Sequence, residues 1–154
     1  MLAVAVPESP GVDAVMLEAR AGHFAKRSIK TSAKLAGIDL AIACMDLTTL
    51  EGRDSPGRVR SMCAKAIAPA PGVRSVAAVC VYPNLVAVAH DALAGSTVKI
   101  ASVATAFPSG LSALQVKLED TQAAIDAGAD EIDMVIDRGA FLSGDERKVF
   151  EEII

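Results

Sequence analysis

The chain has 154 residues, enough for one compact domain with a substantial apolar core. Hydrophobic residues make up 52% of it and aromatic residues only 3%, so aliphatic side chains must fill that core. The net charge of −4, with acidic and basic residues interspersed, argues against nucleic acid as a partner, because that function favours a strongly basic surface.

The first 37 residues predict helices. Apolar positions at helical spacing favour one helix over residues 12–21 and a second over 25–35. Gly37 follows the second segment, where a helix-ending glycine is expected. We therefore predict a helical extension over residues 1–37, ahead of a main domain over 38–154.

Four repeats of a strand followed by a helix are expected in the main domain. Ser55 has the character of a helix N-cap, and Gly95 and Gly128 stand where helices should end. Ser143 and Glu146 have the spacing of a capping box and predict the start of the last helix. The expected strands are apolar runs at residues 41–47, 76–82, 98–104 and 131–136.

The helix expected after Gly110 is amphipathic. Its apolar side should face the core, and Lys117 belongs to its polar side. The apolar side consists of four residues at helical spacing: Leu111, Leu114, Leu118 and Ile125.

Strands that are apolar on both faces and alternate with helices indicate an α/β fold with a helix-covered parallel sheet. An open doubly wound sheet and a (β/α)8 TIM barrel both fit this pattern. The turn from Thr48 to Gly52 lacks the glycine pattern of a dinucleotide site. A whole barrel needs about 250 residues, so this chain would supply half of one. The end at Ile154, without a helix C-cap, is what we expect of a truncated domain.

Asp133 is a carboxylate in the middle of an apolar segment, and an unpaired buried carboxylate is costly. Two interpretations stay open from the residues alone. The strand could be half-buried, with Glu131, Asp133 and Val135 on a wet or paired side. Alternatively, Asp133 is a proton-transfer group at the mouth of a parallel β/α fold, where such groups gather.

The three cysteines are odd in number and form no CxxC pair. We therefore expect no disulfide framework and no metal site, and a reducing cytoplasm fits best. Pro7 and Glu8 interrupt the apolar N-terminus, and no basic residue precedes it. The sequence thus predicts neither a signal peptide nor a membrane span.

Four segments, in order, resemble deoxyribose-phosphate aldolase over residues 38–154. The resemblance implies a (β/α)8 barrel and a class I aldolase that uses a Schiff-base lysine on the sixth strand, without metal or organic cofactor. Such enzymes cleave 2-deoxy-D-ribose 5-phosphate reversibly to acetaldehyde and glyceraldehyde 3-phosphate. The segments are Met45 to Leu50, Ala78 to Pro83, Ala101 to Gly110 and Gly128 to Asp133.

The resemblance also assigns roles to residues. Asp133 matches the family's proton-relay aspartate, because imine and enamine formation each move protons. Asp46 and Thr48 match polar positions that line the substrate pocket, although a turn that caps the strand end explains them equally well. Cys80 matches a cysteine of the pocket wall. Lys99 lies near the start of its strand and is expected to be a solvated lysine rather than the nucleophile.

The function expected is therefore a deoxyribose-phosphate aldolase of deoxyribonucleotide catabolism, with a sugar phosphate as the small-molecule substrate. The Schiff-base lysine falls outside the 154 residues, so the isolated chain is expected to be inactive. The alternative is an inactive half-barrel that self-associates or pairs with a complementary half, because open sheet edges and an open apolar face favour association.

Overall fold

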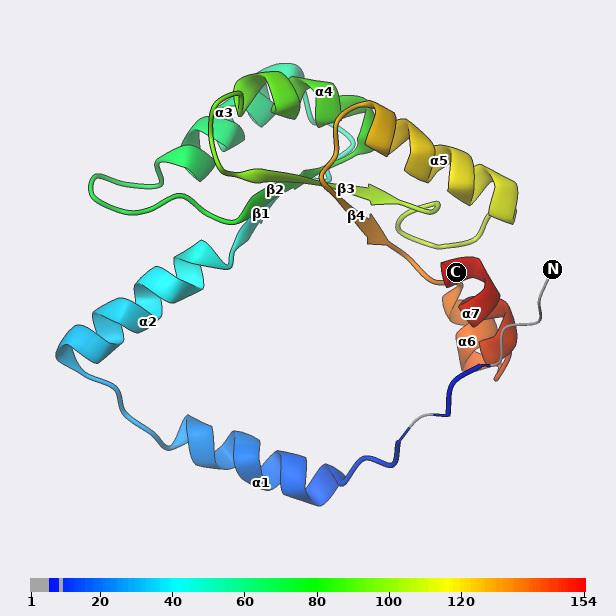
Figure 1. Cartoon of the computed structure of the whole chain (residues 1–154), viewed down its shortest axis with the longest axis horizontal. Helices are drawn as coiled ribbons and strands as arrows, with labels where there is room; N and C mark the ends of the chain where they lie inside the picture. The colour runs from blue at the N-terminus through cyan, green and yellow to red at the C-terminus, as the bar shows by residue number, and fades with distance from the viewer. Residues whose placement is uncertain (1–5, 9) are drawn as a thin grey trace.

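The computed structural model describes residues 6–8 and 10–154 (Figure 1). Among these residues, every helix is too short or too polar to cross a lipid bilayer. Helices and strands alternate from β1 to β4, as the sequence predicts, and two helices follow β4. The helices are α1 (Ala14–Ala25), α2 (Thr31–Ala43), α3 (Pro56–Ile67), α4 (Pro83–Ala92), α5 (Leu114–Asp126), α6 (Arg138–Leu142) and α7 (Glu146–Ile153). The strands are β1 (Asp46–Thr48), β2 (Ala78–Val81), β3 (Lys99–Ala104) and β4 (Glu131–Met134).

The four strands form one sheet in the order β1-β2-β3-β4, and every neighbouring pair is parallel. Thr48 lies opposite Cys80, which lies opposite Ala101, and Ala101 in turn lies opposite Glu131. Sequential parallel strands joined by helices are the building principle of the β/α barrel. The predicted fold class, a partial TIM barrel preceded by helical segments, is confirmed.

The main hydrophobic core lies between the sheet and the helices on one of its faces (Figure 1). Alternate residues of the strands point to this face, and apolar residues of α3 and α4 meet them. Burial of these aliphatic side chains is the main stabilising contribution to the fold. The core includes Val59, Cys63, Val79, Val81, Leu85, Val86, Ala89 and Ile100.

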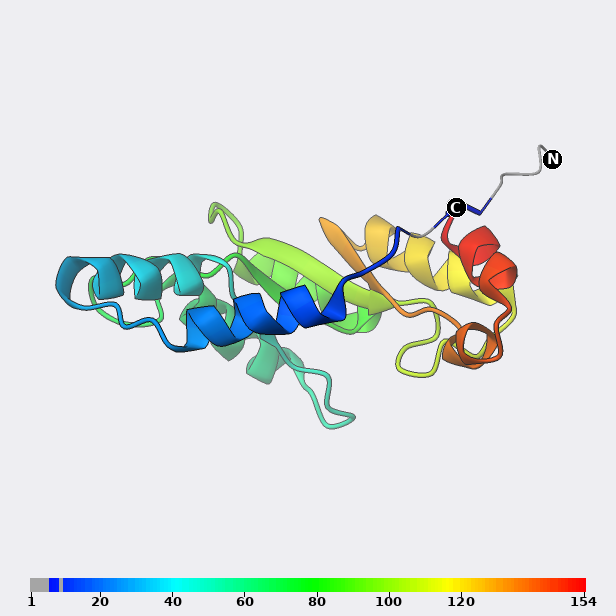
Figure 2. The ribbon, with the colours of Figure 1, turned by 90° about the horizontal axis from the view of Figure 1, so that it is seen from below.

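The opposite, inner face of the sheet carries a much smaller cluster. Cys80, Ala101 and Val103 are buried there, and Tyr82 and Phe107 pack against them. The rings of Tyr82 and Phe107 meet edge to face, with their centroids 6.0 Å apart. In Figure 2, which views the molecule from below, α1 and α2 lie nearest the viewer, on this side of the sheet. Neither of these two helices has a buried residue. Because neither helix packs tightly on the sheet, the inner face is open along its two edge strands, β1 and β4.

The prediction of a strand over residues 41–47 is wrong for its first half. Residues up to Ala43 belong to α2, and β1 begins only at Asp46. A short alanine-rich apolar run does not distinguish helix from strand, and alanine favours the helix. The same helix runs through Gly37, which therefore does not end it. Its C-cap is Cys44.

The predicted capping box at Ser143 is also wrong. The N-cap of α7 is Asp145, whose carboxylate accepts a hydrogen bond from the backbone N–H of Lys148 at 3.2 Å. Ser143 instead ends the short helix α6, and its hydroxyl donates to the carbonyl of Ala140 at 3.0 Å. The unexpected helix α6 ends at Ser143, so α7 starts two residues later than predicted and Asp145 caps it.

The prediction for the faces of α5 is wrong as well. Lys117 is only 3% exposed, because its ammonium group pairs with the carboxylate of Glu152 on α7 at 2.6 Å. Ala124 is the other buried residue of this helix. The side chains expected to face the core are instead exposed: Leu111, Leu114, Leu118 and Ile125. The burial of Lys117 follows from its pairing with Glu152, whereas the four apolar side chains are 42–68% exposed.

Candidate active site

The inner face brings together the four predicted site residues. Because the strands are parallel, their carboxyl ends lie at one edge of the sheet, where barrel sites form. Thr48 and Cys80 are direct partners in the β1–β2 ladder. Asp46 shares a strand face with Thr48, since side chains alternate along a strand. Asp46 was expected at the end of the first strand, but it is the first residue of β1 and lies level with Ala78, because α2 takes up the residues before it. Asp133 lies opposite Val103, which belongs to the same inner cluster as Cys80.

The thiol of Cys80 lies in the field of these groups. Burial and the nearby negative charges of Asp133 and Asp46 raise the pKa of Cys80 to about 11. Hydrogen bonds with the backbone of Val103 and the side chain of Thr48 act in the opposite direction. A carboxylate from β1 and one from β4 therefore both act on a single thiol of β2.

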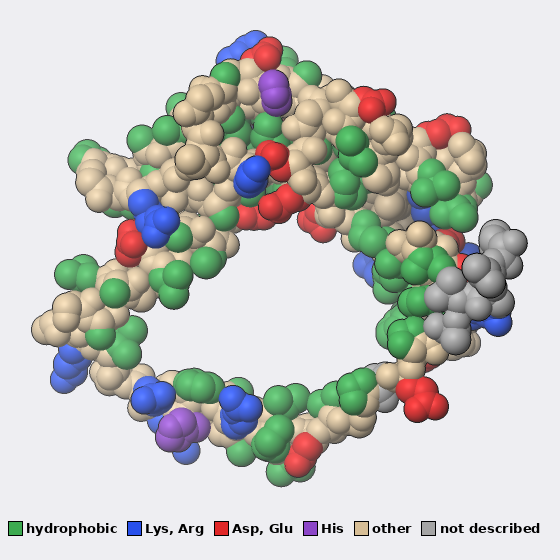
Figure 3. All heavy atoms as spheres, in the orientation of Figure 1, with side chains coloured by type: hydrophobic (Ala, Val, Ile, Leu, Met, Phe, Trp, Pro, Cys, Tyr) green, Lys and Arg blue, Asp and Glu red, His purple; other side chains and the backbone are tan. Residues whose placement is uncertain are grey.

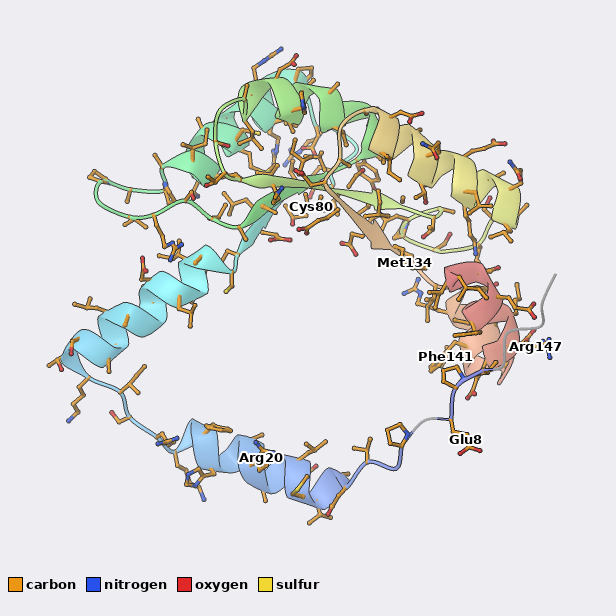
Figure 4. The ribbon with its side chains drawn as sticks, in the orientation of Figure 1. Glu8, Arg20, Cys80, Met134, Phe141 and Arg147 are labelled. Carbon is orange, nitrogen blue, oxygen red and sulfur yellow. The ribbon has the colours of Figure 1, made fainter. Side chains whose placement is uncertain are left out.

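The carboxylates gather around an open hollow. The space-filling view shows acidic side chains along the sheet where it borders the opening of the molecule (Figure 3). The stick view places Cys80 on the sheet at this opening and Met134 at the end of β4 (Figure 4). A face of this kind can accept protons, hydrogen-bond hydroxyl groups and attract a cation.

Asp133 is exposed, as expected if β4 is a half-buried strand with Asp133 on its wet side. Its neighbour on the same face, Glu131, is exposed too. The physical reason is that β4 is an edge strand, and no described element covers its inner face. Neither carboxylate needs a partner to offset a cost of burial, since water solvates both.

The loop after β1 is held by a polar network that the sequence did not reveal. The carboxylate of Asp54 accepts hydrogen bonds from the hydroxyl of Thr49 at 2.8 Å and from the backbone N–H of Glu51 at 2.9 Å. Arg58 of α3 lies 3.0 Å from the same carboxylate, whose side chain is 2% exposed. Burial alone would raise the pKa of Asp54, but these partners lower it below its usual value.

The strand end nearest Asp133 has its own supports. The hydroxyl of Thr105 accepts a hydrogen bond from the N–H of Val135 at 2.7 Å and donates to the carbonyl of the same residue at 2.9 Å. Asp137 caps α6 and accepts a hydrogen bond from Lys148 at 2.6 Å. The hydrogen bonds from Lys148 and from the backbone N–H of Ala140 lower the pKa of Asp137. Only the position of these residues just after strands hinted at such a role.

Lys99 occupies the position that the sequence predicts. It lies at the amino end of β3, with its side chain 57% exposed, and pairs with Asp130 at 3.1 Å. Lys117 is buried between α5 and α7, outside the inner face. In the described part of the chain, no lysine lies at the carboxyl end of a strand, and no cluster of side chains has the composition of a metal site.

Fold and site together define the class: a β/α-barrel protein, present as four βα units, with polar side chains at the carboxyl ends of its strands. Residues 40–154 match the family model of DeoC/LacD family aldolases. The chain is also 38% identical over 143 residues to the deoxyribose-phosphate aldolase of Bos taurus, a match that covers 84% of this chain. The chain belongs to the DeoC/LacD family of aldolases.

Solved structures agree with this assignment. An aldolase named QR15 is similar with a TM-score of 0.64 at 29% identity, over 72% of this chain and 47% of its own. A deoxyribose phosphate aldolase from Aeropyrum pernix, described as a tetramer, gives a TM-score of 0.55 at 25% identity. That match covers 80% of this chain and 52% of the other. The chain spans 45% of the bovine relative, so it corresponds to less than half of that protein.

Proposed function

We propose that this chain supplies the first four βα units of a deoxyribose-phosphate aldolase. The reaction would be the reversible Schiff-base cleavage of 2-deoxy-D-ribose 5-phosphate to acetaldehyde and glyceraldehyde 3-phosphate, within cytoplasmic deoxyribonucleotide catabolism. One observation carries the proposal: Asp46, Thr48, Cys80 and Asp133, which come from three separate strands, share the inner face of the sheet. Thr48, Cys80 and Asp133 lie in the carboxyl-terminal halves of their strands, whereas Asp46 is the first residue of β1.

Each of these residues has a role that suits its surroundings. Asp133 is exposed on the open face, so its carboxylate can exchange protons with a bound imine or with water. Asp46 and Thr48 are exposed on the same face and can hydrogen-bond the hydroxyl groups of a sugar. Cys80 is buried with a protonated thiol and forms part of the pocket wall, without acting as a nucleophile.

The Schiff-base nucleophile is not among the lysines of this chain. Lys99 is at the wrong end of its strand, and Lys117 is engaged by Glu152 away from the inner face. The carboxylates of the inner face would suit an ammonium group from a later strand, because opposite charges attract across a partly dry site. The 154-residue polypeptide on its own is therefore proposed to lack aldolase activity.

Borohydride trapping tests the assignment of the nucleophile. The purified chain is mixed with 2-deoxyribose 5-phosphate and sodium borohydride, and each lysine-containing peptide is examined by mass spectrometry. We expect no reduced adduct. An adduct on Lys99, or on any other lysine of the chain, would show that the nucleophile lies within these residues.

The role of Asp133 requires a complete barrel. Residues 1–154 joined to the C-terminal half of the bovine aldolase would provide one, and turnover can be measured with Asp133→Asn and with the matched control Glu131→Gln. We expect the first change to lower turnover by about 100-fold or more, in line with the loss of a general acid–base group. The second should change it little. Equal effects of the two changes would refute a specific proton-relay role for Asp133.

A non-catalytic half-barrel is the second candidate. The open inner face and the many exposed apolar side chains favour association of the chain with itself or with a complementary half. Light scattering of the purified chain over a range of concentrations distinguishes the two states. A stable monomer would exclude self-association, whereas a dimer or larger species would support it.

A further inference from the structure

The end of β4 is held by a side chain where the backbone ladder stops. The last paired residues of the β3–β4 ladder are Ala104 and Met134. Thr105, the next residue of the first strand, has a φ of +61°, which turns its backbone away from the sheet. Its backbone therefore does not continue the ladder toward Val135, the next residue of the other strand.

The hydroxyl of Thr105 takes the place of that missing backbone partner. It accepts from the N–H of Val135 at 2.7 Å and donates to the carbonyl of Val135 at 2.9 Å, so one side chain satisfies both backbone groups of one residue. Both groups are partly buried, and leaving them unpaired would be costly. A threonine with a left-handed backbone conformation is itself unfavourable, and these two hydrogen bonds offset that strain.

The next residue of β4's extension is held by the same loop. Gly110 has a φ of +70°, and a Cβ atom at this position would lie 2.3 Å from the carbonyl oxygen of Ile136. Asp120 of α5 accepts a hydrogen bond from the backbone N–H of Ala106 at 3.2 Å, which ties the loop to its own helix. Two residues of the β3–α5 loop, Thr105 and Gly110, thus contact the two successive residues Val135 and Ile136 that follow β4.

These contacts matter because, among the described residues, β4 pairs with a strand on one side only. Asp133 lies two residues before Val135, on a strand whose other edge is open. Without a hold at Val135, the strand could rotate or fray from its last ladder pair, and the carboxylate would move away from the thiol of Cys80. The place of Asp133 on the inner face thus depends on hydrogen bonds made by Thr105.

We propose that Thr105 is a positioning residue for Asp133, and that its hydroxyl fixes the carboxyl end of β4 so that this carboxylate stays on the inner face that it shares with Cys80. The inference rests on the proposed function, which gives Asp133 its role as a proton-transfer group. Its geometry can nevertheless be tested without any aldolase activity.

The test uses the 154-residue chain and two measurements. Hydrogen exchange of the Val135 amide reports the hold on the strand, and the pH dependence of Cys80 alkylation, followed by peptide mass spectrometry, reports the nearby charge of Asp133. Thr105→Val removes the hydroxyl at almost constant shape, and Thr105→Ser keeps it. Thr121→Val is the matched control, because the Thr121 hydroxyl bonds only within its own helix, to the carbonyl of Lys117 at 2.9 Å.

We expect Thr105→Val to speed exchange at Val135 by about 10-fold, the effect of losing about one net hydrogen bond. It should also shift the alkylation profile of Cys80 to lower pH, in the same direction as Asp133→Asn. Thr105→Ser and Thr121→Val should leave both measurements unchanged. Because burial is the largest cause of the raised pKa of Cys80, a general loosening of the chain would also move the midpoint to lower pH. Thr105→Val is therefore measured in the Asp133→Asn background as well, where a shift that acts through Asp133 should disappear and a shift from loosening should remain.

Three results would overturn the proposal. Unchanged exchange at Val135 in Thr105→Val would show that the hydroxyl does not hold the strand. Faster exchange with an unmoved Cys80 profile would show that the hold does not position Asp133. An unmoved profile in Asp133→Asn would show that the carboxylate is not beside the thiol. If Thr105→Val does not fold, Thr105→Ala, which removes the hydroxyl without adding bulk at a positive φ, decides in its place.

Discussion

The buried pair between Lys117 and Glu152 should be one of the most sensitive points of the fold. Their side chains are 4% and 11% exposed, and the charged atoms are 2.6 Å apart. Replacing Lys117 with methionine keeps the length of the side chain but leaves the carboxylate buried without its partner. Breaking a buried ion pair in this way typically costs about 3 kcal/mol or more. We expect Lys117→Met to lower the free energy of unfolding by that amount.

Urea unfolding followed by circular dichroism provides the measurement. The midpoint should fall while the dependence on urea concentration stays the same, which would indicate a change of stability rather than of compactness. Lys99→Met is the matched control. Lys99 also pairs with a carboxylate, that of Asp130 at 3.1 Å, but its side chain is 57% exposed. That exposed pair should contribute less than about 1 kcal/mol.

The double variant Lys117→Met/Glu152→Met completes the cycle. Replacing both charges with apolar side chains removes the unpaired carboxylate, so most of the stability lost in the single variant should return. If the double variant is instead as unstable as the sum of the two single changes, the pair is not coupled. A cost below about 1 kcal/mol for Lys117→Met would equally refute the view that burial makes this pair important.

Three further outcomes are expected. Gly110→Ala should destabilise the chain by more than about 1 kcal/mol in the same urea assay, because the added Cβ meets the Ile136 carbonyl at a positive φ; an unchanged midpoint would refute the close contact. Because the folded-state pKa of Asp54 is lowered, its stabilising contribution is present above its unfolded value of 3.8 and is lost as the pH falls through the folded value. Asp54→Asn should therefore reduce the loss of stability between pH 5 and pH 3, and a loss as large as that of the wild type would contradict the assignment. At pH 8 a thiol with a pKa of about 11 is only about 0.1% ionised, so iodoacetamide should modify the exposed Cys44 well before Cys80; equal rates would contradict the buried setting of Cys80.

The repeating pattern of strands and helices could be predicted from sequence because it depends on local signals. Continuous aliphatic runs such as residues 76–82 and 98–104 have few alternatives once flanked by turn residues, and both became strands of a parallel sheet. The segment before β1 was harder, since the short apolar pattern of residues 41–43 does not distinguish a helix from a strand. Pairing with β2 decides where the strand begins, and the described ladder pairs only Asp46, Leu47 and Thr48 with that strand.

Side-chain partners far apart in sequence could not be predicted. Lys117 and Glu152 are 35 positions apart, and Thr105 and Val135 are 30 apart. No local pattern distinguishes a lysine that pairs across helices from one on a solvated surface. Asp133 stood out from the residues alone, as an acid within an apolar segment, whereas Asp46, Thr48 and Cys80 were accessible only through the family resemblance. The exposure of Asp133 depends on which elements cover β4, a property of the whole arrangement.

The supports of the strand ends explain how an open face can carry a site at all. Side chains on the inner face of β1 and β4 have few neighbours, so the packing that usually orders a catalytic group is missing there. Order must come from the adjoining loops, through Asp54 after β1 and Thr105 after β3. Both side chains bind backbone groups beside the sheet and stay off the inner face itself. The face thus keeps its carboxylates exposed and available for chemistry, while the strands that carry them are held from outside the site.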